Sequence, residues 1–255
     1  MASHESDDDL SLSASTLNAL KEFYAERDAR AEQFAKLQAK ADALHAAAKE
    51  KLLTMDAFAE DWNESQFWYA EETAGLYAKL LLEGATENTT IAVVSAPSVF
   101  VALKNVLSSA PPEQPKPNLI LLEHDRRFAI FPEFVYYDFV QPLKLPAHLK
   151  GTCDRIIADP PFLSEDCQTK AAITVRWLSR PPTASPAPDQ ESQGEPRPQP
   201  LLIVSTGERM KDIVTRVYRS FGLRATDYEP KHARGLSNEF YCYANFKCES
   251  WGWRE

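Results

Sequence analysis

Short apolar runs alternate with amphipathic stretches from about residue 72 to residue 246. The apolar runs have the length of strands buried on both faces, and the stretches between them carry apolar residues at helical spacing. The predicted strands are residues 91–94, 119–122, 134–137, 156–158, 201–204 and 240–246, and the predicted helices are residues 72–82, 99–107, 165–179 and 209–221. Because strands and helices alternate, we predict an α/β fold with a Rossmann-like, mostly parallel sheet and helices on both faces.

Three regions lack this alternation. Residues 1–10 are acidic and predict a disordered tail, and residues 11–55 are rich in Ala, Lys, Glu and Gln, which predicts an added N-terminal helix on the surface. Residues 181–200 are rich in Pro, Ser, Gln and Glu and almost free of apolar side chains, so we predict a disordered insert. The predicted α/β domain spans residues 56–250 and contains that insert.

Composition narrows the class of protein. The 255 residues have a formal net charge of −9, which argues against a duplex-DNA binder because such proteins need a basic surface. The four cysteines show no CxxC spacing and predict reduced thiols, and the five histidines pair with no cysteine at a metal-ligand spacing, so we expect no metal site. No apolar run reaches membrane length, and the N-terminus lacks an apolar targeting segment. We therefore expect a cytoplasmic protein with no membrane partner.

The most informative stretch is residues 154–162, where a predicted strand stops abruptly. Pro160 and Pro161 cannot continue the strand, because neither has an N–H for the sheet. Asp159 precedes a proline, which favours an extended backbone and places its carboxylate at the carboxyl end of the strand, where open α/β sheets bind ligands. A carboxylate and a proline carbonyl can accept the hydrogens of an amino group and leave its lone pair free to attack, with the Phe162 ring beside the substrate. The alternative is an ordinary Asp-Pro turn with Phe162 in the core.

Residues 159–162, Asp-Pro-Pro-Phe, resemble the Asp/Asn-Pro-Pro-aromatic motif of S-adenosylmethionine-dependent methyltransferases that act on amino groups. That motif occurs in adenine-N6, glutamine and some lysine enzymes, so it indicates a reaction rather than a substrate. Residues 61–69, 94–99, 158–166 and 238–243 resemble a narrower family, the lysine methyltransferases of translation elongation factor 1-alpha, formerly described as adenine-specific DNA methyltransferases. The resemblance implies a seven-stranded methyltransferase sheet, S-adenosyl-L-methionine as cofactor and elongation factor 1-alpha as protein substrate.

Acidic residues at two predicted strand ends are candidate cofactor ligands. Glu123 follows the second strand, where a carboxylate can accept both hydroxyls of a ribose, and the resemblance implies that Asp138 reaches the adenine amino group. The loop at residues 95–98 lacks a Gly-rich dinucleotide fingerprint, which argues against a nicotinamide enzyme. The predicted site residues are Asp159, Pro160 and Phe162 for catalysis, Ser95, Ala96, Glu123, Asp138 and Asp159 for the cofactor, and Gln66, Trp68, Tyr69 and Phe162 for the substrate channel.

Three functions remain open at this point. The leading hypothesis is a monomeric protein-lysine methyltransferase with no stable nucleic-acid partner. The second is an adenine-N6 nucleic-acid methyltransferase, which would need base flipping and a clamp for the nucleic acid. The third is a binding protein without catalysis, which would not need an intact Asp-Pro-Pro-Phe motif. The acidic balance of the chain and the lack of a separate target-recognition segment favour the first hypothesis.

Overall fold

The computed structural model describes residues 53–55, 58, 60, 66–111, 113–182, 199–235 and 239–254. The predicted acidic tail, nearly all of the predicted N-terminal helix and the centre of the predicted insert lie outside the described residues, so these remain predictions. In the portion of the chain that is described, no helix combines the length and the apolar character needed to cross a lipid bilayer.

Seven strands of the described chain form one sheet, in the order β3-β2-β1-β4-β5-β7-β6. Their bounds are β1 Thr90–Val94, β2 Asn118–Glu123, β3 Phe134–Tyr136, β4 Arg155–Ala158, β5 Leu201–Gly207, β6 Arg224–Ala225 and β7 Phe240–Ala244. The first five strands pair in parallel, and β7 runs antiparallel to both β5 and β6. The predicted seven-stranded, mostly parallel sheet is confirmed.

The connections reverse direction between β1 and β4. From β1 the sheet continues to β2 and β3 on one side, whereas from β4 it continues to β5 and β7 on the other. At such a switch point the loops that leave neighbouring strands turn away from each other, and the crevice between them is where open α/β sheets bind ligands. The topology therefore predicts a site above the carboxyl ends of β1 and β4.

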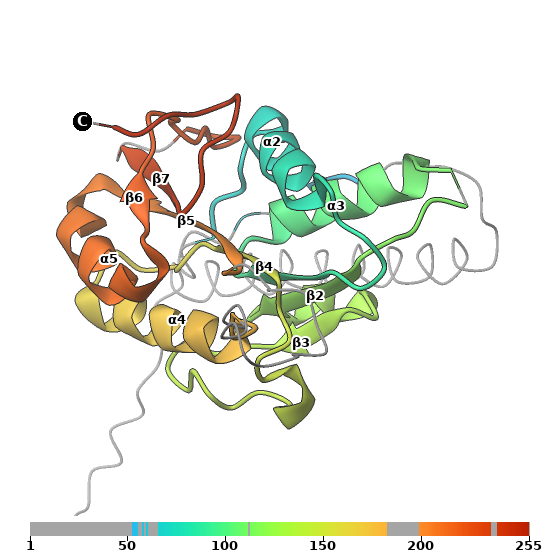
Figure 1. Ribbon diagram of the computed structural model, residues 1–255, viewed down its shortest axis with the longest axis horizontal. Coiled ribbons are helices and arrows are strands. Elements are labelled where there is room, and N and C mark those ends of the chain that lie inside the picture. Colours follow the sequence, from blue (N-terminus) through green and yellow to red (C-terminus); the bar gives the residue numbers. More distant parts are fainter. Residues whose placement is uncertain are drawn as a thin grey trace, which may run out of the picture. The chain divides into compact units, whose positions relative to one another are not determined.

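Helices cover both faces of the sheet (Figure 1). Those on one face are α2 (Glu71–Leu82) and α3 (Pro97–Ser109), and those on the other are α4 (Glu165–Leu178) and α5 (Lys211–Val217). Because successive side chains of a strand point to opposite faces, Ile91 and Val93 pack in the core with α2 and α3, whereas Ala92 and Val94 pack in the core with α4 and α5. Burial on both faces explains why the central strands are continuous apolar runs.

The prediction of one helix over residues 209–221 is wrong. The structure divides this stretch into η5 (Glu208–Met210), α5 and η6 (Arg219–Phe221). Gly222 ends η6 at a φ of 66°, in the left-handed region that glycine enters without steric cost. The strand β6 follows and has only two residues in register with β7, too few for a sequence period to reveal. Two more single-turn helices, η3 (Arg126–Ile130) and η4 (Ala147–Leu149), lie in the loops around β3.

Candidate active site

A cavity of about 490 Å³ lies at the switch point. One end, here called the β1–β3 end, is lined by Ser95, Glu123 and Asp138, which follow β1, β2 and β3. The other, here called the β4–β7 end, is lined by residues 160–163 after β4, by His232 and by Phe240 at the start of β7. Residues 66–68, which precede α2, also line the cavity.

The turn after β1 is strained. Ser95 has a φ of 55°, the one positive φ at a non-glycine position in the described chain. Its N–H donates to the Leu122 carbonyl at 2.9 Å, which extends the pairing of β1 with β2 by one residue. A side chain in this region costs about 1–2 kcal/mol, and such strain is concentrated at functional sites. Ala96 follows with its side chain buried in the core, so Ser95 contributes to the cavity lining and Ala96 does not.

Glu123 is a buried carboxyl group at the end of β2. Its Oε1 accepts hydrogen bonds from the backbone N–H of His124 at 2.8 Å and of Asp125 at 3.0 Å. Burial raises the pKa of Glu123 to about 7, although both backbone hydrogen bonds act in the opposite direction. Since Oε1 is occupied, Oε2 is the oxygen left to accept a hydrogen bond from a ligand.

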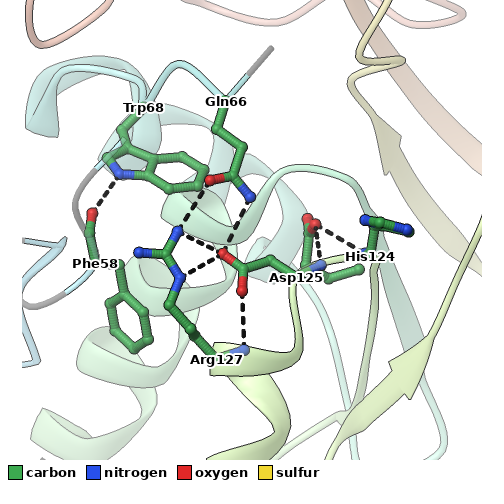
Figure 2. A network of polar contacts seen from close by, with 7 residues as sticks. Phe58, Gln66, Trp68, His124, Asp125 and Arg127 are labelled. Atoms are coloured by element: carbon green, nitrogen blue, oxygen red, sulfur yellow. Dashed lines mark hydrogen bonds and ion pairs between the residues drawn. The ribbon is translucent and has the colours of Figure 1, made fainter. Parts of the chain in front are cut away.

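A polar network ties residues 66–68 to the end of β2 (Figure 2). Gln66 donates from Nε2 to Asp125 at 3.0 Å, and its Oε1 accepts from Arg127 at 2.9 Å. Arg127 in turn donates from Nε to the same Asp125 oxygen at 2.8 Å. Both ends of the Gln66 amide are therefore engaged, which fixes the segment that carries Trp68. The Trp68 indole N–H donates to the Phe58 carbonyl at 2.6 Å, as Figure 2 also shows.

Asp159 stands between the two ends of the cavity. Its N–H donates to the Val94 carbonyl at 3.0 Å, which continues the pairing of β4 with β1 one residue beyond the strand. Pro160 then stops the ladder and leaves the half-buried carboxyl group facing the cavity. Burial raises the pKa of Asp159 to about 7; the Tyr69 hydroxyl lowers it, and the nearby charge of Glu123 raises it further.

The loop after Asp159 is held in place by contacts with α4 and with the end of β5. Gln168 of α4 donates to the Phe162 carbonyl at 3.2 Å and to the Thr206 hydroxyl at 3.0 Å. Leu163 lies over Gly207, where any added Cβ would come within 2.9 Å of its side chain. The Phe162 side chain is 37% exposed, with its ring centroid 5.5 Å from that of Phe139. The alternative that placed Phe162 in the core is therefore wrong.

At the β4–β7 end, two segments distant in sequence are joined. Residues 231–233 pair with residues 68–70 through hydrogen bonds from Ala70 N–H to the Lys231 carbonyl and from Ala233 N–H to the Trp68 carbonyl, each 2.8 Å long. Between these bonds the His232 ring lies 5.0 Å from the Tyr69 ring, centroid to centroid. Backbone pairing therefore builds this wall of the cavity and sets the position of the imidazole.

The structure brings together most of the predicted site residues. Those that line the cavity are Gln66, Trp68, Ser95, Glu123, Asp138, Asp159, Pro160 and Phe162. Tyr69 lies behind the wall rather than in the channel, with 3% of its surface exposed. Sequence reasoning assigned no role to His124 or His232, and placed Phe240 in the last predicted strand and in a resemblance but not in the site. Within the described residues, no group of three or more His, Cys, Asp or Glu side chains could hold a metal ion.

The sheet and its Asp-Pro-Pro-Phe loop define a Rossmann-like methyltransferase. The family model described as probable N6-adenine methyltransferase matches residues 60–248. Protein-lysine N-methyltransferase EFM5 of Saccharomyces cerevisiae is 43% identical and aligns over 94% of this chain and 93% of its own length. EEF1A lysine methyltransferase 1 is 32% identical in Homo sapiens, over 96% of both chains, and 33% identical in Gallus gallus, over 95% of this chain and 97% of that one.

The chain belongs to this family of methyltransferases, whose relatives named here are protein-lysine N-methyltransferases. The adenine activity appears in the name of the family model and not in the names of these relatives. The resemblance drawn from the sequence is therefore confirmed, and the methyltransferase class with it.

Proposed function

We propose that the chain transfers a methyl group from S-adenosylmethionine to a lysine of translation elongation factor 1-alpha. The similar proteins of Gallus gallus and Homo sapiens carry the name EEF1A lysine methyltransferase 1. The observation that supports lysine most directly is the charge of the cavity. Its described lining contains the three carboxyl groups of Glu123, Asp138 and Asp159 and neither lysine nor arginine. Such a lining attracts an ammonium group and repels a phosphate backbone.

Asp159 can accept a proton from a lysine acceptor and orient its amino group. At neutral pH the lysine side chain is an ammonium ion and has no lone pair until it loses a proton. Because burial raises the pKa of Asp159 to about 7, its carboxylate is a better proton acceptor than an exposed aspartate. Together with the Pro160 carbonyl, it can then accept the remaining N–H hydrogens and direct the lone pair.

The β1–β3 end fits the nucleoside part of the cofactor. Glu123 has Oε2 available for a ribose hydroxyl. Asp138 is held by a hydrogen bond from the Val140 N–H to its Oδ1 at 2.8 Å, and it lines the cavity where an adenine amino group would lie. The left-handed turn at Ser95 brings backbone to the same end. When bound, S-adenosylmethionine supplies an electrophilic methyl group on a positively charged sulfur.

The adenine-N6 activity in the name of the family model is the alternative. An enzyme of that kind must hold a phosphate backbone beside its cavity while the base is flipped into it. The acidic lining argues against this. A cytoplasmic location and a monomeric state remain predictions from the sequence.

The test is a methyl-transfer assay with a labelled donor and three separate acceptors: purified elongation factor 1-alpha, DNA and RNA. The expected result is label on the protein alone, placed on a lysine by mass spectrometry. The Asp159→Ala variant serves as the control for contaminating activity. Label on nucleic acid and none on protein would overturn the proposal in favour of the adenine enzyme.

A further inference from the structure

The cavity lining contains two histidines, one at each end. His124 lies beside Glu123 at the β1–β3 end, and His232 lies at the β4–β7 end. Nothing in the methyltransferase mechanism described above uses His232. Its position is nonetheless fixed by the backbone pairing of residues 231–233 with residues 68–70. A side chain held in this way and turned to a cavity is a candidate for contact with the substrate.

The His232 ring is held on two sides. Its centroid lies 5.0 Å from that of Tyr69, with the rings tilted by 35°, and 4.6 Å from that of Phe240 in an edge-to-face arrangement. The loop is further anchored by the Lys231 N–H, which donates to the Thr73 hydroxyl at 3.0 Å. The imidazole therefore has little freedom to turn away from the cavity.

The ring nitrogens of His232 are available to a ligand. Neither makes a hydrogen bond within the described residues, and the side chain is half-buried with a surface on the cavity. Burial lowers the pKa of His232 to about 4, although the charge of Glu60 acts in the opposite direction. At physiological pH the imidazole is thus neutral, so one nitrogen keeps a lone pair that can accept a hydrogen bond.

The sheet order places His232 on the acceptor side of Asp159. Apart from Asp159 itself, the cofactor candidates follow β1, β2 and β3, all on one side of β4. Phe240 pairs with Gly207, the last residue of β5, so the antiparallel β7 begins at the same edge of the sheet but on the other side of β4. Since His232 contacts Phe240, a substrate that reaches Asp159 from the side away from the cofactor passes the imidazole.

We propose that His232 determines specificity for the lysine acceptor: its neutral imidazole accepts a hydrogen bond from the incoming ammonium group while its ring, with Phe240, flanks the alkyl chain. This inference rests on the proposed lysine activity and adds a residue that contacts the substrate. A protonated histidine would repel the ammonium, whereas the neutral form attracts it. The aromatic neighbours Tyr69 and Phe240 contribute to this selectivity, because packing against them buries the His232 ring and favours its uncharged form.

The test separates the nitrogen from the ring. His232→Phe keeps an aromatic ring against Tyr69 and Phe240 but removes both nitrogens, and His232→Gln keeps an acceptor oxygen but loses the ring. For each variant, kcat and KM are measured with elongation factor 1-alpha and with S-adenosylmethionine, and affinity for S-adenosylhomocysteine is measured by calorimetry. His148→Ala, on the exposed part of η4 away from the cavity, is the matched control.

For His232→Phe we expect the KM for the protein to rise roughly tenfold or more, since a hydrogen bond to a charged group is lost, with cofactor KM and S-adenosylhomocysteine affinity unchanged. His232→Gln should recover part of that loss. A wild-type KM for the protein in His232→Phe would overturn the inference, because a residue that only packs is replaced well by phenylalanine. Wild-type enzyme that labels no protein would instead refute the proposed function, so the two failures are distinguishable.

Discussion

The two ends of the cavity are built in different ways. At the β1–β3 end, polar side chains are fixed by local contacts: Glu123 by the two backbone N–H groups that follow it, and Asp125 by Arg127 and Gln66. At the β4–β7 end, rings predominate, and the wall forms only because residues 231–233 pair with residues 68–70. The first arrangement suits a small polar ligand of fixed shape, and the second suits an alkyl chain with a charged tip.

Asp159 belongs to neither end and serves both. The nearby charge of Glu123 raises the pKa of its carboxyl group, and the Tyr69 hydroxyl lowers it. The three parts of the cavity should therefore have separable effects. Changes at the β1–β3 end should alter cofactor binding, changes at the β4–β7 end should alter protein binding, and changes at Asp159 should alter turnover.

The largest expected effect follows from Asp159→Ala. Turnover on protein should fall by roughly a hundred- to ten-thousandfold, because the variant loses both the proton acceptor and the group that orients the amine. Affinity for S-adenosylhomocysteine should stay within about threefold of wild type, since the proposed nucleoside contacts lie at the β1–β3 end. Asp159→Asn keeps one acceptor oxygen and should retain more activity than the alanine variant. Equal loss of cofactor affinity and turnover in Asp159→Ala would erase the distinction between the ends.

Glu123→Ala should weaken cofactor binding at the β1–β3 end and leave protein binding unchanged. Calorimetry should show cofactor affinity weakened by about 1–3 kcal/mol, because hydroxyl groups of the ligand are left without an acceptor. At saturating cofactor, the KM for elongation factor 1-alpha should be near the wild-type value. A rise in protein KM of the same size as the loss of cofactor affinity would contradict the assignment.

Gln66→Leu tests whether the network of Figure 2 positions the same end. The substitution keeps the size of the side chain and removes both amide contacts to Asp125 and Arg127, so cofactor affinity should weaken by about 1 kcal/mol. A double-mutant cycle with Arg127→Ala should show coupling, since the two side chains are bonded to each other. Gln114→Leu, on the exposed loop after α3, is the matched control. Strict additivity in the cycle would show that the contacts do not act as one unit.

The raised pKa of Asp159 predicts a pH dependence of stability. Unfolded, this group titrates near pH 4, and folded near 7, so the contribution of its protonated form is complete below about pH 4 and is lost as the pH rises to about 7. Asp159→Asn avoids that loss. Its unfolding free energy without cofactor should exceed that of wild type by about 1 kcal/mol at pH 8, after discounting for contact with solvent in the cavity, and the excess should shrink toward pH 4. Denaturation at both pH values measures the difference, and a constant excess would refute the linkage.

The smallest effect is expected outside the cavity. Replacing residues 183–198 by a short Gly-Ser linker should change the unfolding free energy by less than about 1 kcal/mol, because the cost of loop closure varies slowly with length. Turnover and both KM values should remain those of wild type. A selective rise in the protein KM would show that this insert contributes to substrate binding.

Much of the fold follows from the sequence, because the parallel strands are buried on both faces. The predicted strand at residues 156–158 is β4 less one residue, and the predicted helix at residues 72–82 is α2 less one. The errors lie where few residues decide the structure. Residues 209–221 have a helical period, yet the stretch divides into single turns around α5, and the two-residue β6 exists only through its pairing with β7.

The site was predictable where local backbone determines it. Pro160 and Pro161 end β4 and set the position of Asp159, so the sequence itself carries that information. His232 carries no such signal. It becomes part of the cavity through Tyr69, an isolated bridge partner more than 160 positions away, and a sequence period cannot report contacts of that range. The prediction that placed Tyr69 in the substrate channel failed for the same reason. The sequence shows that the residue is aromatic, but not that its ring lies behind the cavity wall rather than inside the cavity.

The long-range pairing also fixes an order of assembly. The hydrogen bonds of Thr73 with Tyr228 and of Lys231 with Thr73 join positions 155 and 158 residues apart. Contacts of such separation cost more loop-closure entropy than local ones, so we expect them to form late in folding. During synthesis the ribosome releases β1 to β5, with their carboxylates, before it releases His232. We therefore expect a growing chain to complete the edge proposed to bind the nucleoside before the wall proposed to face the lysine, and to be inactive toward proteins until residues 231–240 have been made.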